Sequence, residues 1–134
     1  MVEKKRFGVY VPGDLAKDLE ACMKTLGLKS KSKLVQEALR LFINEHKWKL
    51  RGKAVGIVGV VYDHEAQDVD EKLTDIQHEY LDVIVSSVHV HLDERRCMLA
   101  IIVRGSTRKI RELLNEIMKI NGVLAIRQLL LAAE

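Results

Sequence analysis

The chain has 134 residues, of which 48% are hydrophobic and 31% charged, and its formal net charge is +3. This composition suits one folded domain or two small ones, and no apolar run reaches the roughly 20 residues of a membrane span. The first residues, MVEKKRFG, lack the apolar segment of a secretory signal, and the two cysteines lie too far apart to indicate a disulfide framework. We therefore expect a protein of the reducing cytoplasm with no membrane association.

The charge is divided unevenly along the chain. Residues 1–53 carry 13 Lys and Arg against 6 Asp and Glu, a balance of +7, whereas residues 54–134 carry 9 against 13, a balance of −4. This split predicts a basic first part that binds a polyanion and a neutral-to-acidic second part. The stretch HKWKLRGK is polar and basic and ends in glycine, so we predict domains over residues 1–50 and 51–134.

A short strand is predicted at the start of the first domain. In KRFGVYV, residues 5–11, the side chains alternate between two faces. This strand has no partner in its own domain, and the economical solution is antiparallel pairing with a second copy over four interlocked helices. A two-stranded ribbon fits the DNA major groove and presents one face to the base edges. The residues that we predict to bind DNA from this ribbon are Lys4, Lys5, Arg6, Gly8 and Tyr10.

Two helices are predicted after this strand. Asp14 is placed to cap the first helix and Gly27 to stop it. Cys22 falls in the apolar stripe of that helix, so we interpret it as core packing rather than as a metal ligand. The second helix begins LKSKSK, and the charge of Lys31, the hydroxyl of Ser32 and the first backbone N–H groups suit contacts with DNA phosphates.

The second domain is predicted to have the order βαββαβ. The expected strands are residues 54–62, 83–92, 97–105 and 123–131, and the expected helices are residues 67–82 and 106–122. This order is that of the ferredoxin-like split unit, which small regulatory domains of the ACT type share. The predicted fold class is therefore α+β, with a βαα module followed by an ACT-like domain.

Histidines and a cysteine gather in residues 78–97. His89 and His91 are separated by one residue in a predicted strand, so both imidazoles should point to the same face. Together with the thiol of Cys97 they form a nitrogen/sulfur set that suits a transition metal. The alternative is two surface histidines and a buried cysteine that acts as a small hydrophobe. The residues expected on the other face of this strand, toward the core, are Val88, Val90 and Leu92.

His78 lies on a predicted helix, about 180° from the apolar stripe that begins at Val69. It is either a solvent-facing histidine or a ligand that this helix gives to a site shared with another subunit. The turn DERR also matters for the site. A four-residue turn would pair Leu92 with Cys97 and place the thiol on the core face, so we predict an odd-length or bulged turn that places Cys97 with His91.

These motifs carry a resemblance that covers essentially the whole chain. The βαα module resembles the ribbon-helix-helix DNA-binding fold, and QHEYLD and SSVHVHLDERRC within a βαββαβ domain resemble the nickel-responsive regulators of the NikR family. The resemblance implies one square-planar Ni(II) per chain, held by His89, His91 and Cys97 of one subunit and His78 of a neighbour. It also implies a homotetramer, a dimer of dimers, that binds a palindromic double-stranded operator and represses nickel uptake genes, and no enzymatic activity.

Two features depart from the pattern of that family. Gly8 and Tyr10 stand where members usually show small hydroxylated residues, so Arg6 is the firmer candidate for base contact. Lys33 stands where some members carry a carboxylate of a second cation site. We predict that no separate cation binds there and that Lys33 is placed to pair with Glu37 instead.

Three other functions remain open. The same scaffold would suit a copper, cobalt or zinc sensor, because copper binds such donors at least as tightly as nickel. A metalloenzyme is disfavoured, since four protein ligands leave no open position and no clear general base lies beside the site. An ACT-like amino-acid sensor would keep its DNA response after Cys97→Ala, whereas a nickel sensor would lose it. We interpret His46 and His64 as surface histidines and Trp48 as packing between the domains.

Overall fold

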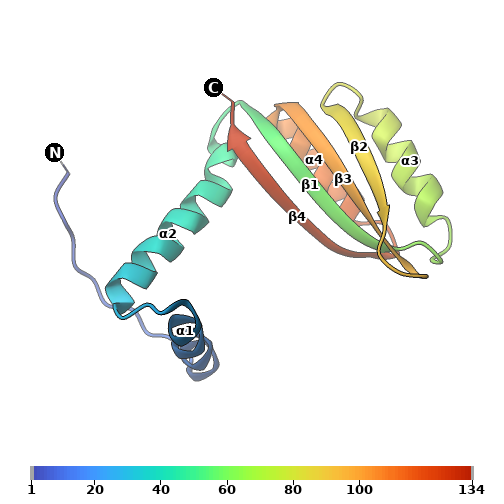
Figure 1. Ribbon diagram of the computed structural model, residues 1–134. Coiled ribbons are helices and arrows are strands. Elements are labelled where there is room, and N and C mark those ends of the chain that lie inside the picture. The colour runs from blue at the N-terminus through green and yellow to red at the C-terminus, as the bar shows by residue number, and fades with distance from the viewer. Residues whose placement is uncertain (1, 134) are drawn as a thin grey trace. The chain divides into compact units, whose positions relative to one another are not determined.

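The computed structural model describes residues 2–133 and is drawn in Figure 1. The chain divides into two compact units, one up to Leu41 and one from Phe42 onward. This division falls inside helix α2, before the boundary predicted after residue 50. Each unit is described by itself below. None of the helices in the described residues is long and apolar enough to cross a membrane.

The first unit holds helix α1, Gly13–Leu26, and most of helix α2, Lys31–Lys47. Helix α1 begins at Gly13, so Asp14 lies in its first turn rather than at the predicted cap position. Gly27 ends this helix as predicted, with φ 67°, in the left-handed region that favours glycine. The hydroxyl of Ser30 caps α2, because it accepts a hydrogen bond from the backbone N–H three residues on, at 3.1 Å.

The strand predicted over residues 5–11 is not formed in the single chain. Residues 2–12 have neither helix nor strand. A strand exists only through hydrogen bonds to a neighbour, and within the described residues no segment of this chain pairs with this stretch. Its apolar side chains are exposed, and so is much of the apolar face of the two helices. The exposed large apolar residues of this unit are Val2, Phe7, Val9, Tyr10, Val11, Leu15, Leu26, Val35, Leu39 and Leu41.

Cys22 differs from its predicted place in the core. It is exposed, whereas its neighbour Met23 is buried. Two short helices offer too little apolar surface to cover both stripes, so one part of the predicted core stays open in a single copy. The interpretation of Cys22 as core packing is therefore wrong for the single chain.

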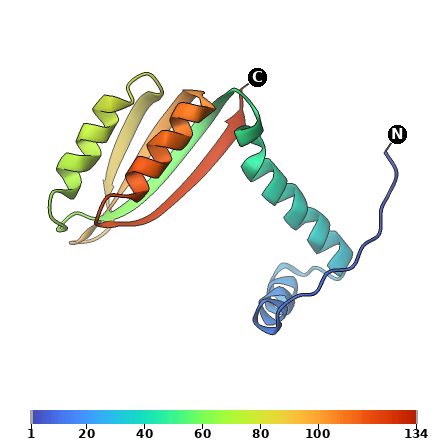
Figure 2. The same cartoon turned by 180° about the vertical axis from the view of Figure 1, so that it is seen from behind.

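The second unit is a two-layer α+β domain whose element order confirms the predicted βαββαβ arrangement. Its elements are the short helix η1, Trp48–Leu50; β1, Lys53–Asp63; α3, Val69–Glu79; β2, Ile84–His91; β3, Arg96–Ser106; α4, Thr107–Met118; and β4, Val123–Ala132. The strands form one antiparallel sheet in the order β2-β3-β1-β4. Helices α3 and α4 cover the same face of this sheet, as the two opposite views show (Figure 1, Figure 2).

The core of the second unit lies between the sheet and these two helices. Helix α4 illustrates how the sequence builds it: its apolar residues recur at helical spacing, and Ile110, Leu113, Leu114 and Ile117 are all buried. Trp48 also belongs to this core, and its indole N–H has no hydrogen-bond partner among residues 2–133. It therefore packs inside the second unit.

The other face of the sheet, here called the open face, carries no helix of the described chain. It is apolar over all four strands, because side chains alternate and every second residue of each strand points to this side. The exposed residues that define the open face are Val55, Ile57, Val88, Val90, Ile102, Leu129 and Leu131. An exposed apolar surface of this extent is typical of an interaction site.

Candidate metal centre

The hairpin of β2 and β3 sets the geometry of the candidate centre. His91 pairs directly with Cys97, so the intervening loop, residues 92–96, has five residues. The predicted odd-length turn is thereby confirmed. Residues opposite each other in an antiparallel pair share a face, and the imidazole of His91 and the thiol of Cys97 consequently lie side by side.

The side chain of Asp93 stabilises this five-residue loop. Its Oδ1 accepts hydrogen bonds from the backbone N–H groups of Arg95 and Arg96, at 3.0 and 2.7 Å, and its Oδ2 accepts one from the Arg96 guanidinium at 2.7 Å. The backbone N–H of Arg96, the largest contribution, and its guanidinium lower the pKa of Asp93 to about 2. The loop therefore depends on an ionised carboxylate.

The two strand histidines lie on the helix-covered face, which corrects the predicted orientation of β2. His89 pairs with Leu99 and His91 with Cys97, and both of these partners are buried under the helices. The residues predicted to face the core are instead exposed: Val88 by 56%, Val90 by 38% and Leu92 by 47%. Alternation along a strand fixes which residues share a face but does not say which face the helices cover. Because β2 is the edge strand, its helix-side histidines also stay exposed.

The donor atoms of His89, His91 and Cys97 all lie within 4.8 Å of one another. The thiol sulfur of Cys97 is 3.3 Å from Nδ1 of His91, and the two imidazole rings meet edge to face with their centroids 4.8 Å apart. A single ion about 2.0–2.3 Å from each donor places neighbouring donors about 3 Å apart and opposite donors about 4.3 Å apart. These three residues therefore fit one soft or borderline metal ion, and they leave a further position for a ligand from elsewhere.

Tyr62 borders the candidate centre and was not anticipated from the sequence. It is buried on β1, pairs with Cys97, and stacks on His89 with ring centroids 6.2 Å apart. Burial and the carboxylate of Asp70 on α3 raise the pKa of its hydroxyl. Its place at the end of an apolar strand was visible in the sequence, but its neighbours depend on sheet register, which the sequence does not show.

His78 stands apart from this cluster. It is exposed in the last turn of α3 and does not belong to the group of converging donors within the described residues. This agrees with the expectation that His78 need not meet the strand histidines of its own chain. His64 bonds through Nε2 to the backbone carbonyl of Glu94, and His46 bonds to the carbonyl of Phe42 at 2.8 Å, so both have local structural partners.

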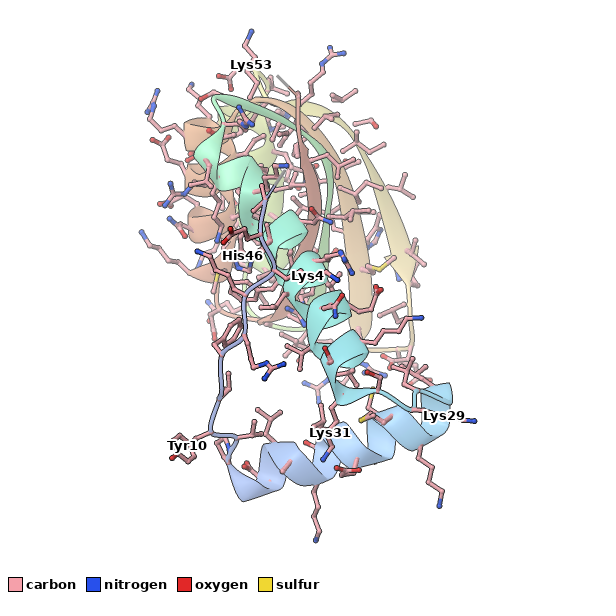
Figure 3. The ribbon with its side chains drawn as sticks, turned by 90° about the vertical axis from the view of Figure 1, so that its left-hand side faces the viewer. Lys4, Tyr10, Lys29, Lys31, His46 and Lys53 are labelled. Atoms are coloured by element: carbon pink, nitrogen blue, oxygen red, sulfur yellow. The ribbon has the colours of Figure 1, made fainter. Side chains whose placement is uncertain are left out.

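The residues predicted to contact DNA are all exposed. They are Lys4, Lys5, Arg6, Gly8 and Tyr10 before α1, and Lys31 and Ser32 at the start of α2. Figure 3 shows Tyr10 pointing away from the first unit and Lys31 at the start of α2. Lys31 forms an exposed ion pair with Glu20 at 2.9 Å, which costs little to break on contact with phosphate.

The ion pair predicted between Lys33 and Glu37 is not formed. Glu37 instead pairs with Arg40 at 3.5 Å, on the next turn of α2. Both spacings bring charges together on a helix, and Arg40 adds a second cation within reach of the same carboxylate. The carboxylate of Glu37 therefore has a cationic neighbour other than Lys33, in an exposed pair.

Comparison with known proteins places most of the chain in one group. A family model described as NikR C terminal nickel binding domain matches residues 55–131. A protein of Dictyoglomus thermophilum described as "Putative nickel-responsive regulator" is 41% identical over 124 residues, 92% of each chain. A protein of Methanocaldococcus jannaschii with the same description is 37% identical over 129 residues, 95% of this chain and 92% of that one. The alignments with these relatives thus include residues of both the first and the second unit.

A solved structure has the same fold at low sequence identity. The uncharacterized protein TM1266 from Thermotoga maritima matches with a TM-score of 0.50 and 14% identity, over 61% of this chain and 99% of that one. At this identity the likeness concerns the fold alone.

Proposed function

Because this chain belongs to the NikR family of nickel-responsive regulators, we propose that it is a nickel-dependent repressor that acts in the cytoplasm. In this proposal it binds a palindromic double-stranded operator and controls nickel uptake genes. One Ni(II) per chain is held by His89, His91 and Cys97 of one subunit and by His78 of another. The relatives are described as regulators, and regulation rather than catalysis is the activity that we assign.

The convergence of two imidazoles and one thiol on the β2–β3 hairpin carries this proposal. Their donor atoms lie within 4.8 Å of one another, and a five-residue loop brings the thiol to the histidines. A nitrogen/sulfur donor set suits Ni(II) and Cu(II), whereas Zn(II) prefers a closed tetrahedron. Bound nickel would link the three donors of one chain to the imidazole of His78 of another.

His78 supports a site that two subunits share. It is exposed in its own chain and outside the three-residue cluster, so its imidazole is available to a neighbour. The open face supports the assembly that such a site needs, because association of copies would cover seven apolar side chains that are exposed in the single chain. We propose a homotetramer, built as a dimer of dimers.

The first unit supports DNA binding through a paired ribbon. Residues 2–12 are exposed and have no strand partner within residues 2–133, and much of the apolar face of the two helices is exposed. Pairing of two copies would complete the strands, cover this apolar surface and place Arg6 and Tyr10 on one side of a two-stranded ribbon. Such a ribbon suits the major groove, and the lysines before it suit the phosphates.

Titration of the reduced, metal-free protein with Ni(II), followed by absorption spectroscopy, tests this function. We expect one nickel per chain and a planar spectrum with thiolate-to-nickel bands. Cys97→Ala should abolish these bands and the nickel-dependent gain in operator affinity. Cys22→Ala is the matched control, because it removes the only other thiol, which lies outside the cluster, and should change neither.

Two alternatives give different results in the same experiment. In a sensor of copper, cobalt or zinc, that metal would occupy the site when it competes with Ni(II) at cellular concentrations. The thiolate-to-nickel bands would then be absent. An ACT-like sensor of a small effector would keep its DNA response in the Cys97→Ala variant. Retention of that response would therefore reject the nickel site.

A further inference from the structure

Three segments far apart in the sequence meet at one end of the second unit. They are the turn after α3, the start of α4, and the linker that leads from α2 into β1. Figure 2 shows all three at the same end of the sheet, in yellow, orange and green. The turn begins directly after His78 and Glu79, and the linker is the chain's connection to the first unit.

The turn after α3 is joined to the start of α4 by an ion pair. Nζ of Lys109 lies 2.8 Å from Oδ2 of Asp82, and the lysine holds the pKa of that carboxyl below its usual range. Both side chains are partly exposed, and such a pair alone stabilises little. Its neighbours add to it: Val83 is buried, and its carbonyl accepts a hydrogen bond from the backbone N–H of Arg104 at 2.8 Å.

Gly105 shows how closely this turn approaches. Its φ of +139° disfavours other residues, and a Cβ there would lie only 3.1 Å from Cγ1 of Val83. The side chain of Val83 thus packs directly against the backbone of Gly105 at the end of β3. A shift of the turn after α3 would be transmitted to the residues that begin α4, because Val83 packs directly against Gly105 and Asp82 pairs with Lys109.

The start of α4 is joined in turn to the linker. The hydroxyl of Thr107 donates a hydrogen bond to the carbonyl of Arg51 at 2.7 Å, and its backbone N–H donates one to the carbonyl of Gly52 at 3.1 Å. Thr107 is only 8% exposed. One residue therefore fixes two successive carbonyls immediately before β1, and the position of the linker follows the first turn of α4.

We propose that these contacts couple nickel binding by His78 to the position of the linker in the same chain. We call this set of contacts the relay. Asp82, Lys109 and Thr107 act in it as positioning residues. The inference rests on the proposed function, in which His78 completes the nickel site of a neighbour. The three-residue cluster lies at the other end of the sheet: Cys97 pairs with Tyr62, about 30 Å along β1 from the linker. The DNA-binding unit that responds is consequently the one whose chain donates His78.

Three single variants and two controls test the relay in the full-length protein. Asp82→Asn, Lys109→Met and Thr107→Val each remove one side-chain contact and keep the shape of the residue. Arg108→Met is the control for charge, because Arg108 pairs with Glu112 within α4, at 2.8 Å. Thr74→Val is the control for the hydroxyl, because Thr74 bonds to the carbonyl of Asp70 within α3.

The measured quantity is the ratio of operator affinities with and without nickel. We expect each relay variant to reduce this ratio by about two- to thirtyfold, with nickel stoichiometry and spectrum unchanged. The controls should keep the wild-type ratio. If these residues had only a structural role, their loss would lower the operator affinity equally with and without nickel and leave the ratio unchanged. An unchanged ratio in all three variants therefore overturns the relay.

An exchange of charges provides a rescue. The double variant Asp82→Lys with Lys109→Asp restores the ion pair in reverse, and it should recover most of the ratio lost in the single variants. If the double variant folds and binds nickel but does not recover the ratio, the part of the relay that runs through this pair is overturned. A wild-type protein that binds nickel without any change in operator affinity overturns the proposed function and the relay together.

Discussion

Cys97 is at once a core side chain and a candidate metal donor. It is fully buried between Leu99 and Tyr62 on the helix-covered face, yet its sulfur reaches Nδ1 of His91 at the edge of the sheet. A buried thiol is inert toward solvent, and an ion beside it would supply the charge that a thiolate needs. This position therefore suits both packing in the core and the proposed coordination of a metal ion.

The first prediction concerns pH and nickel affinity. The thiol of Cys97 must lose its proton to bind, so nickel binding releases protons and competes with them. We expect the nickel affinity to fall by about tenfold per pH unit for each proton released as the solution is made more acidic. Competition titrations against a chelator at several pH values measure this slope. A nickel affinity that is independent of pH would contradict a thiolate ligand.

The second prediction concerns Asp93 and acid stability. Its pKa is lowered to about 2 in the folded chain, so its contribution to stability is present above its unfolded pKa of about 4 and is lost as the pH falls toward 2. Asp93→Asn should therefore lower the free energy of unfolding at pH 7 and flatten its decrease between pH 4 and pH 2. Denaturant unfolding across this range measures both effects. Glu94→Gln is a suitable control, since that side chain forms no ion pair within residues 2–133.

At the scale of single residues, the sequence predicted which candidate donors converge but not their surroundings. HxH spacing on a strand and the odd turn were enough to predict that His89, His91 and Cys97 share a face, and the structure confirms that they do. The face itself was predicted wrongly, because the apolar residues Val88 and Val90 were expected in the core and instead lie on the open face. Tyr62 was missed because its contact with His89 depends on the register of β1 against β3.

The β2–β3 hairpin is the element on which the centre depends. Side chains alternate with a period of two, so a change of one residue in the loop moves every later residue of β3 to the other face. The rest of β3 resists such a slip, because Leu99, Ile101 and Val103 are buried under the helices. A change in loop length would therefore alter the first residues of β3, including Cys97, and leave the rest of the strand in register.

The third prediction uses that dependence. Deletion of Glu94 would leave a four-residue loop and turn the thiol of Cys97 away from the histidines, or else strain the loop. We expect loss of the thiolate-to-nickel bands and a fall in nickel affinity larger than the about 10- to 100-fold that loss of an outer-shell partner costs. Absorption spectra of the loaded variant test this. Insertion of two residues after Glu94 is the matched control, because it keeps the loop odd and should keep the bands.

Element order was the most predictable level of this fold. Alternation gave the strands and helical spacing gave α3 and α4, and their bounds agree with the structure within a few residues. The prediction covered the order of elements along the chain, and the structure adds the spatial order of the strands, β2-β3-β1-β4. The strand predicted over residues 5–11 is not formed, since no segment within residues 2–133 pairs with it.

At the scale of the whole molecule, the uncovered surfaces are the main observation. The open face of the sheet, the apolar face of α1 and α2, and the stretch 2–12 are each incomplete in one copy. Exposed apolar surface on this scale favours association. Sequence analysis predicted the assembly through resemblance to a family, and the single chain adds the surfaces that would be buried in it.

The fourth prediction tests whether two subunits build each site. His78→Ala and Cys97→Ala chains should each fail, when alone, to bind nickel with the wild-type spectrum. Mixed tetramers of the two should regain about a quarter of the sites by random pairing, because a cluster from the first chain meets His78 of the second. Nickel binding by co-expressed, doubly tagged complexes measures this recovery. A mixture of His78→Ala with the double variant His78→Ala/Cys97→Ala is the control and should recover none.

Trp48 gives the protein an optical probe of its own. It is the chain's one tryptophan, and it is fully enclosed where α2 ends and the linker begins. Its emission therefore reports on a single place, and a shift to longer wavelength would signal that water has reached the indole. Stopped-flow fluorescence after nickel addition would time the linker's response without any label, and its rate could be compared with that of thiolate absorption at Cys97.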